Sequence, residues 1–284
     1  MAPNAPDGHD MELCQTVEAA ALRVRCQIIR MLDASREGHL GGPLSSVDML
    51  CALYFHHMRF DLTRPKWEER DRFVLSKGHA AVALYATLGE AGFLPREELF
   101  TFRQIGGRLA GHPDMKRTPG VDMSSGSLGV GISTAVGMAI GAKLRRAAWR
   151  VYCLVGDGES QSGEVWEAAM AAAHYRLDNL TVLLDRNGLQ VDGPVAEVMG
   201  IQPIKAKWEA FGWHVLEVDG HAIGQILDAL DTASQVPGQP QLIIAHTTKG
   251  KGCSLAENVV ACHAMNLTHE QCLATLAELK GGQR

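Results

Sequence analysis

The sequence predicts an α/β protein built on a doubly wound, mainly parallel sheet flanked by helices. Short apolar runs alternate with segments of helical periodicity along nearly the whole chain, and this alternation favours a parallel sheet with helices on its faces. The 284 residues, 46% of them hydrophobic, suffice to bury roughly three quarters of the unfolded surface in one domain. We expect that domain over residues 13–284, after a short disordered leader over residues 1–12.

Each element is expected where its own periodicity is clearest. Apolar residues that recur every three or four positions indicate a helix, and short runs rich in β-branched residues indicate a strand. Strands are expected at 73–75, 151–155, 180–184, 214–218 and 242–245. Helices are expected at 16–35, 45–57, 80–91, 132–147, 163–176, 201–211, 222–235 and 269–279.

Composition excludes several classes of protein. The net charge is −5 and the Lys and Arg residues are scattered, so no nucleic-acid partner is expected. The uncharged stretch 123–142 contains many glycines and serines and is too polar to span a membrane. No targeting signal is recognisable, and the seven cysteines are odd in number without a C-x-x-C pair. We therefore expect a cytoplasmic protein with reduced thiols packed in its core.

Two polar turns follow consecutive strand-like runs and carry the most specific signal. They are Gly-Asp-Gly at 156–158 and Asp-Arg-Asn-Gly at 185–188, with a helical segment between them. In an open parallel sheet, ligands bind beyond the carboxyl ends of the strands, where both turns are expected. Mg²⁺ prefers oxygen ligands and keeps phosphate oxygens and water among them. The predicted metal ligands are therefore the side chains of Asp157 and Asn187 and the main chain at Leu189.

Glycines in the first turn would let the backbone approach a diphosphate, and the following helix presents unpaired N–H groups to an anion. Either turn alone is typical of an ordinary loop. Together, with helix and strand between them, they resemble the thiamine diphosphate motif, and the surrounding sequence resembles the amino-terminal half of a transketolase. The resemblance extends from about residue 16 to residue 263. It also rests on GHLGGPLSS at 38–46, DRFVLSKGHA at 71–80, AGHPDMKRTPGVDMSSGSLGVGISTAVGMAIGAKL at 110–144 and HTTKGKGCSLAENVVACH at 246–263.

Transketolases move a two-carbon ketol unit from a ketose to an aldose with thiamine diphosphate and a divalent cation. The resemblance implies that activity here, with Mg²⁺, or Ca²⁺ or Mn²⁺ in its place, and with sugar phosphates or related sugars as substrates. It does not identify the sugar. The cofactor-binding residues that it implies are His79, Ser127, Leu128, Gly129, Gly156, Asp157, Gly158 and Asn187.

Four histidines lie in loops or at helix starts: His39, His79, His112 and His263. Loops carry function more often than cores, and imidazole exchanges protons near neutral pH. A single loop histidine can equally well form a hydrogen bond that only stabilises its own loop. The prediction of a catalytic role therefore rests on the four histidines together. The resemblance implies that His39 and His263 handle protons and hydroxyls at the reacting carbons. It implies further that His112 binds the donor's terminal hydroxyl and that His79 lies beside the diphosphate.

Transketolases hold the cofactor between two domains, and the second domain binds the aminopyrimidine and contributes a glutamate. No counterpart of that domain is recognisable here. The resemblance therefore implies the amino-terminal subunit of a split transketolase, with a separate carboxyl-terminal chain and an α2β2 assembly. Ser162 stands where many transketolases have a glutamate that belongs to a network linking two cofactors, which puts that network in doubt.

Two alternatives stay open. The chain could belong to another thiamine diphosphate enzyme, similar to 1-deoxyxylulose-phosphate synthase or to a 2-oxo-acid dehydrogenase, or it could be a noncatalytic regulatory subunit that binds the cofactor. The loop histidines and the segment 127–133 disfavour the 2-oxo-acid enzymes, and the presence of Asp157 and Asn187 disfavours a noncatalytic role. The segment 247–252 lacks the pattern of a nucleotide phosphate loop, and the resemblance places it near the substrate channel.

Overall fold

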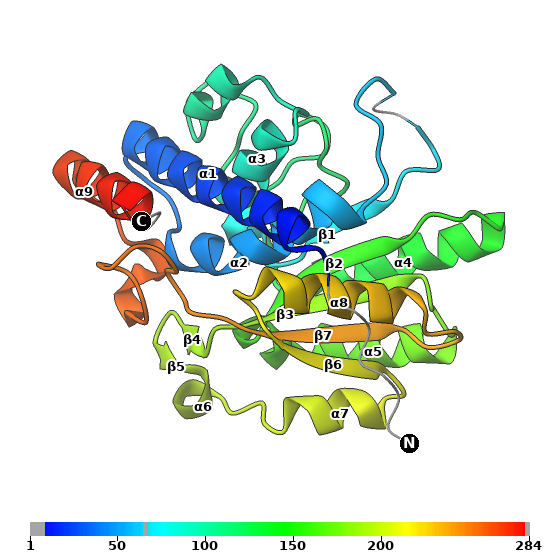
Figure 1. Cartoon of the computed structure of the whole chain (residues 1–284). Helices are drawn as coiled ribbons and strands as arrows, with labels where there is room; N and C mark the ends of the chain where they lie inside the picture. The colour runs from blue at the N-terminus through cyan, green and yellow to red at the C-terminus, as the bar shows by residue number, and fades with distance from the viewer. Residues whose placement is uncertain (1–8, 65–66, 282–284) are drawn as a thin grey trace.

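Five parallel strands form the central sheet of the computed structural model, which describes residues 9–64 and 67–281 (Figure 1). The strand order is β1-β2-β3-β7-β6, and every neighbouring pair is parallel. The predicted doubly wound α/β class is therefore confirmed. The strands are β1 Arg72–Leu75, β2 Val151–Gly156, β3 Leu180–Arg186, β6 His214–Asp219 and β7 Gln241–His246.

Both faces of this sheet are covered, which is why its central strands read as nearly continuous apolar runs. Every residue of β2 is buried, and successive side chains enter two different hydrophobic clusters. Tyr152 and Leu154 pack into one cluster, whereas Val151, Cys153 and Val155 pack into the other. The alternation follows from the two-residue repeat of a strand.

The helices divide between these two faces (Figure 1). The Tyr152 face is covered by α1 Met11–Ser35, α2 Gly41–Ala52, α3 Ala81–Glu90 and α8 Ile223–Ser234. The Cys153 face is covered by α4 Val130–Arg145, α5 Gly163–His174 and α7 Ile204–Ala210. Helix α9 His269–Gly281 packs against α1.

Shorter elements complete the chain. A hairpin of β4 Leu189–Gln190 and β5 Gly193–Pro194 leads into α6 Val195–Val198. A π-helix, η1, covers Leu53–His57 at the end of α2. Single 3-10 turns are η2 Gly78–Ala80, η3 Arg96–Thr101, η4 Gly158–Gln161 and η5 Val260–Ala264.

Successive strands of the chain advance across the sheet from β1 to β6, and the direction then reverses, because β7 lies between β3 and β6. The chain runs from β1 through β2 and β3 to the far edge at β6 with α4, α5 and α7 on one face, and returns to β7 through α8 on the other. Right-handed crossovers place helices on opposite faces when the direction along the sheet reverses. The carboxyl ends of β3 and β7 therefore border the crevice in which an open sheet binds ligands.

Helix α1 begins at Met11, earlier than the expected Thr16. The side chain of Asp10 accepts the N–H of Glu12 at 3.2 Å and caps the helix. Residues 11 and 12 of the expected leader are therefore helical, and residues 1–8 of it lie outside the described residues.

Two other helix starts differ from expectation because of proline. Helix α2 begins at Gly41 and not at Ser45, since Pro43 lies in the first turn, where a missing N–H costs no helical hydrogen bond. Helix α7 begins at Ile204 and not at Ile201, since Pro203 disfavours helical backbone in the residue before it.

The cysteines are unpaired, as their odd number and spacing predicted. All seven lie in the described ranges and are free, and all are buried except Cys14, which is half-buried. Within residues 9–64 and 67–281, no helix is both long and apolar enough to cross a lipid bilayer.

Candidate functional site

The turns after β2 and β3 meet at the carboxyl edge of the sheet, where Gly156 is paired with Asp185. The carboxylate of Asp157 joins them, because it accepts the N–H of Gly188 at 2.7 Å and that of Gly158 at 2.8 Å. Burial, and then the negative charge of Asp185, raise the pKa of Asp157 to about 6. A carboxylate held in this way is stabilised by a nearby cation.

The other two predicted metal ligands lie in the second turn. Asn187 Oδ1 accepts the N–H of Leu189 at 3.2 Å, and Asn187 Nδ2 donates to Asp185 Oδ2 at 3.0 Å. The carbonyl of Leu189 accepts a hydrogen bond from Lys249 Nζ at 2.9 Å. This carbonyl therefore already contacts the positive charge of Lys249, which is not among the site residues predicted from the sequence.

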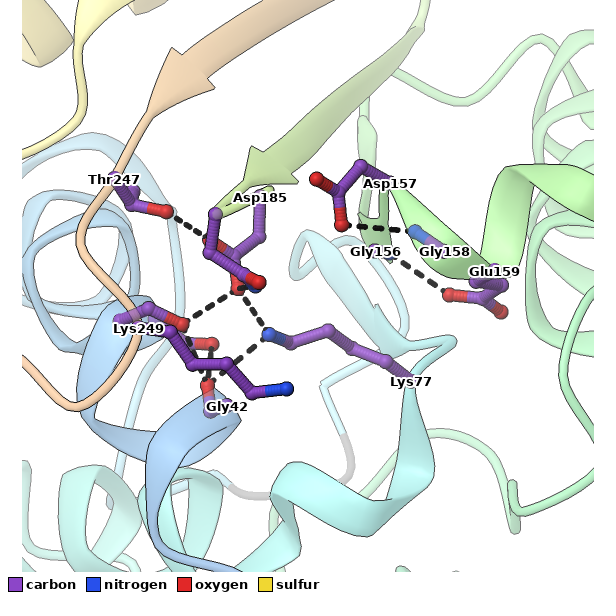
Figure 2. Close-up of polar contacts among 12 residues, drawn as sticks. Gly42, Lys77, Gly156, Asp157, Gly158, Glu159, Asp185, Thr247 and Lys249 are labelled. Atoms are coloured by element: carbon purple, nitrogen blue, oxygen red, sulfur yellow. Dashed lines mark hydrogen bonds and ion pairs between the residues drawn. The ribbon is translucent and has the colours of Figure 1, made fainter. Parts of the chain in front are cut away.

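An ion pair between Lys77 and Asp185 lies at the centre of the site, and both side chains are buried (Figure 2). Lys77 Nζ also donates to the carbonyl of Gly42 at 3.0 Å, and Asp185 accepts hydrogen bonds from Ser45 at 2.7 Å and from Thr247. Burial alone would raise the pKa of Asp185, but Lys77 and the hydroxyl donors lower it. Asp185 therefore stays ionised.

Neither Lys77 nor Asp185 is among the site residues that the sequence predicts. Lys77 lies two residues after β1, and this place near the end of a strand is a usable signal. Asp185 belongs to the second predicted turn, but successive side chains at a strand end point in different directions. The sequence alone did not show that Asp185 would point toward Lys77.

A second buried acid, Glu159, connects three segments of the site, and Figure 2 shows its contact with Gly156. It accepts the N–H of Gly129 at 2.9 Å, the N–H of Gly156 at 3.0 Å and the hydroxyl of Ser76 at 2.5 Å. Burial raises the pKa of Glu159. Gly129 and Gly156 are both among the predicted cofactor-binding residues, and this carboxyl group accepts the N–H of each.

The predicted loop 127–129 lies beside these residues. Leu128 lines the cavity of the site and is 44% exposed, Ser127 is exposed, and Gly129 is buried. Gly129 has φ of 90° and precedes α4, and an added Cβ would lie 2.5 Å from Ser162 Oγ. Glycine is required there both by the left-handed backbone and by the close approach of Ser162.

The four loop histidines come together from distant parts of the chain. The ring centroid of His39 lies 5.2 Å from that of His79, 5.3 Å from that of His263 and 6.3 Å from that of His112. The centroids of His79 and His263 are 4.9 Å apart. Only His112 of the four is exposed.

Three of these rings are neutral at neutral pH. Burial, and then nearby Lys249, lower the pKa of His263 to about 4. Burial is also the largest cause of the lowered pKa of His39, and burial and Lys77 hold the pKa of His79 well below its ordinary value. The 3.3 Å contact from Lys249 Nζ to His263 Nδ1 makes Nδ1 an acceptor, so Nε2 carries the hydrogen of that ring.

His221 belongs to a largely buried hydrogen-bond network that also includes Arg25, Asp48 and Thr248. Asp48 accepts two hydrogen bonds from Arg25 and contacts His221 Nδ1 at 2.7 Å, and His221 Nε2 accepts the N–H of Thr248 at 2.8 Å. These hydrogen bonds fix the backbone at Thr248, the residue next to Lys249. No local sequence pattern connected these four residues.

A cavity of about 230 Å³ lies at the carboxyl edge of the sheet, beside the turns after β2 and β3. Asp157, Asn187, Leu189, His79 and His263 all line it. An added Cβ at Gly42, another lining residue, would lie 3.2 Å from His79 Nε2. A cavity with convergent charged groups and perturbed pKa values is typical of an active site.

Comparison with known proteins agrees with this geometry. A family model described as transketolase, thiamine diphosphate binding domain, matches residues 16–280. A 6-deoxy-6-sulfo-D-fructose transketolase subunit of Clostridium sp. (strain MSTE9) is 47% identical over 86% of this chain and 88% of its own length. An apulose-4-phosphate transketolase subunit of Phocaeicola vulgatus is 42% identical over 90% of this chain and 91% of its own length.

The solved transketolase of Leishmania mexicana has the same fold, with a TM-score of 0.88 and 32% identity over 93% of this chain. This chain spans 41% of the length of that transketolase. Fold, family model and relatives agree with the resemblance drawn from the sequence. The chain therefore belongs to the transketolase family and carries its thiamine diphosphate binding domain.

Proposed function

We propose that this chain is the amino-terminal subunit of a two-chain transketolase, which transfers a two-carbon ketol unit from a ketose to an aldose. One observation carries the proposal: Asp157, Asn187, His79 and His263 line one cavity, and the ring of His39 lies 5.3 Å from that of His263. The names of the two relatives favour this function over the synthase-like, dehydrogenase-like and regulatory alternatives. They also give examples of donors, since one name refers to a sulfonated ketose and the other to apulose 4-phosphate.

The residues present fit a divalent cation. Asp157 and Asn187 supply a carboxylate and an amide oxygen at one wall of the cavity, with the Leu189 carbonyl beside them. Burial and the negative charge of Asp185 raise the pKa of Asp157, and a bound cation would offset both effects. Such oxygens suit Mg²⁺, and also Ca²⁺ or Mn²⁺.

The same cavity fits the diphosphate of thiamine diphosphate. Gly42, Gly156 and Gly158 line its wall without side chains of their own, and Lys249 and His79 also line it and carry nitrogen atoms that can contact a phosphate. When bound, thiamine diphosphate supplies the nucleophilic carbon that cleaves the bond beside a ketose carbonyl. In our proposal the loop of Ser127, Leu128 and Gly129 borders the bound cofactor.

The histidines provide proton transfer next to that carbon. His39 is neutral near pH 7, so it can accept a proton from a sugar hydroxyl. His263 holds its hydrogen at Nε2 and can donate it to a sugar oxygen, while Lys249 fixes the orientation of the ring. His112 is the exposed member of the group and would contact the far end of the donor.

A second chain completes the enzyme in this proposal. Both relatives of similar length are named as subunits of transketolases. Leu128 and Val191, which line the cavity, are 44% and 59% exposed, and a partner would cover them. The resemblance to transketolases makes that partner the chain that binds the aminopyrimidine and supplies the glutamate, in an α2β2 assembly.

The test is a reconstitution. The purified chain with thiamine diphosphate and Mg²⁺ should transfer no ketol unit by itself, and it should become active when mixed with the carboxyl-terminal chain of a split transketolase. Sedimentation should then show a complex of two copies of each. Sustained ketol transfer by the isolated chain, in a preparation free of host transketolase, would refute the requirement for a partner.

A further inference from the structure

A second group of histidine and carboxylate side chains lies on the α8 side of the sheet, outside the cavity. His9 precedes α1, His56 and His57 end the π-helix η1, and Asp228 and Asp231 lie on α8. Residues three apart on a helix share a face, so the two aspartates point in a similar direction. None of these residues lines the cavity or serves the proposed ketol transfer.

The contacts within this group are short. His9 Nε2 lies 3.1 Å from Asp231 Oδ2 and 3.6 Å from Asp228 Oδ1. The rings of His9 and His56 are 5.4 Å apart between centroids, at an interplanar angle of 80°. One ligand atom from each of His9, His56 and Asp231 lies within 4.8 Å of the others.

The second oxygen of Asp231 is also held. His57 Nδ1 contacts Asp231 Oδ1 at 3.3 Å, and the His57 ring packs edge-on against Tyr152 with 5.5 Å between centroids. Metal-binding carboxylates in proteins are commonly oriented by such a further hydrogen bond. The two consecutive histidines therefore have different roles: His56 offers a ligand atom, and His57 orients the carboxylate of Asp231.

The backbone that carries these histidines is itself unusual. The segment Leu53–His57 is a π-helix, which is rare and is found frequently at functional sites. It lies against α8, and together these elements bring His56 and His57 next to Asp231.

We propose that His9, His56 and Asp231 bind a transition-metal ion of the zinc type, with water in the fourth position. Two imidazoles and one carboxylate form a ligand set that Zn²⁺ uses in proteins, with bonds of about 2.0 to 2.2 Å. Nitrogen ligands suit Zn²⁺, Cu²⁺ or Ni²⁺, whereas Mg²⁺ prefers oxygen. The bound ion ties the segment before α1 to η1 and α8 and stabilises the folded chain.

Zinc titration of the full chain tests this site. Any polyhistidine tag is removed, the protein is stripped with a chelator, and millimolar Mg²⁺ is kept present for the oxygen ligands of the cavity. Zn²⁺ binding is then measured by competition with a chromogenic chelator for the wild type, His56→Ala and Asp231→Asn. His174→Ala serves as the matched control, because His174 is an exposed histidine on α5, across the sheet.

The wild type and His174→Ala should bind one more equivalent of Zn²⁺ than His56→Ala, and Asp231→Asn should bind that equivalent at least tenfold more weakly. Zn²⁺ should also raise the melting temperature of the wild type more than that of His56→Ala. Zinc bound to the histidines that all four proteins share cancels in the comparison. Equal stoichiometry and affinity in all four would overturn the proposal.

Discussion

The carboxylate of Asp157 accepts the backbone N–H of Gly188 at 2.7 Å, and this bond joins the turns that follow β2 and β3. Asp185 lies nearby and raises the pKa of Asp157, but its own charge is matched by Lys77. Asp185 therefore belongs to the buried framework of the site, and in our proposal Asp157 is the acid that binds the divalent cation.

Replacement of Asp157 tests that assignment. Asp157→Ala should weaken Mg²⁺-dependent binding of thiamine diphosphate to the assembled enzyme at least tenfold, or about 1.4 kcal/mol, because diphosphate charge loses its metal. Isothermal titration measures the affinity. The control is Asp178→Ala, because Asp178 precedes β3 and so lies at the end of that strand opposite to the site. Like Asp157, Asp178 accepts a backbone N–H, that of Gly238 at 2.8 Å. Unchanged affinity in Asp157→Ala would remove this residue from the site.

The buried Lys77–Asp185 pair predicts a large loss of stability in Lys77→Met. Removing one partner leaves the other charge buried without compensation, which costs about 3–5 kcal/mol. Urea denaturation measures the free energy of unfolding. Lys205→Met is the control, because Lys205 pairs with Glu217 at 3.6 Å in an exposed position and should lose no more than about 1 kcal/mol. Similar losses in both variants would contradict the role of the pair.

His263→Ala and His112→Ala should separate turnover from cofactor binding. Because general acid–base groups act on the substrate, ketol transfer by the reconstituted enzyme should fall roughly 100-fold or more, while affinity for thiamine diphosphate changes little. Steady-state rates and cofactor titrations give the two quantities, with His174→Ala as the control. Wild-type rates with every accepted donor would show that the histidine concerned takes no part in the reaction.

The lowered pKa of His263 predicts a pH dependence of stability. Its pKa is about 4 in the folded chain and near 6.5 when unfolded, so the unfolded state binds more protons between these values. Stability contributed by the neutral ring is therefore present above about pH 6.5 and is lost as the pH falls toward 4. Between pH 7 and pH 5, the wild type should lose more unfolding free energy than His263→Gln. Denaturant titrations at both pH values compare them, and equal losses would contradict the shift.

Much of the fold and part of the site could be predicted because their signals are local. Helices and strands follow the spacing of apolar residues, and most of the expected elements are present. The wrong helix starts arose where a cap or a proline acted, as at Asp10 and Pro203. The turns of Asp157 and Asn187 were predictable because each directly follows a strand.

The sequence by itself determined the strand-helix alternation, the two turns and the loop histidines, since these depend on residues near each other in the chain. Tertiary structure alone decided that Lys77 pairs with Asp185, 108 residues away, and that Glu159 engages the amide of Gly129. Strand order and side-chain direction set which distant groups meet, and burial then sets their charge. The neutral imidazole of His263 and the ionised carboxylate of Asp185 are consequences of that burial and of the partners it brings.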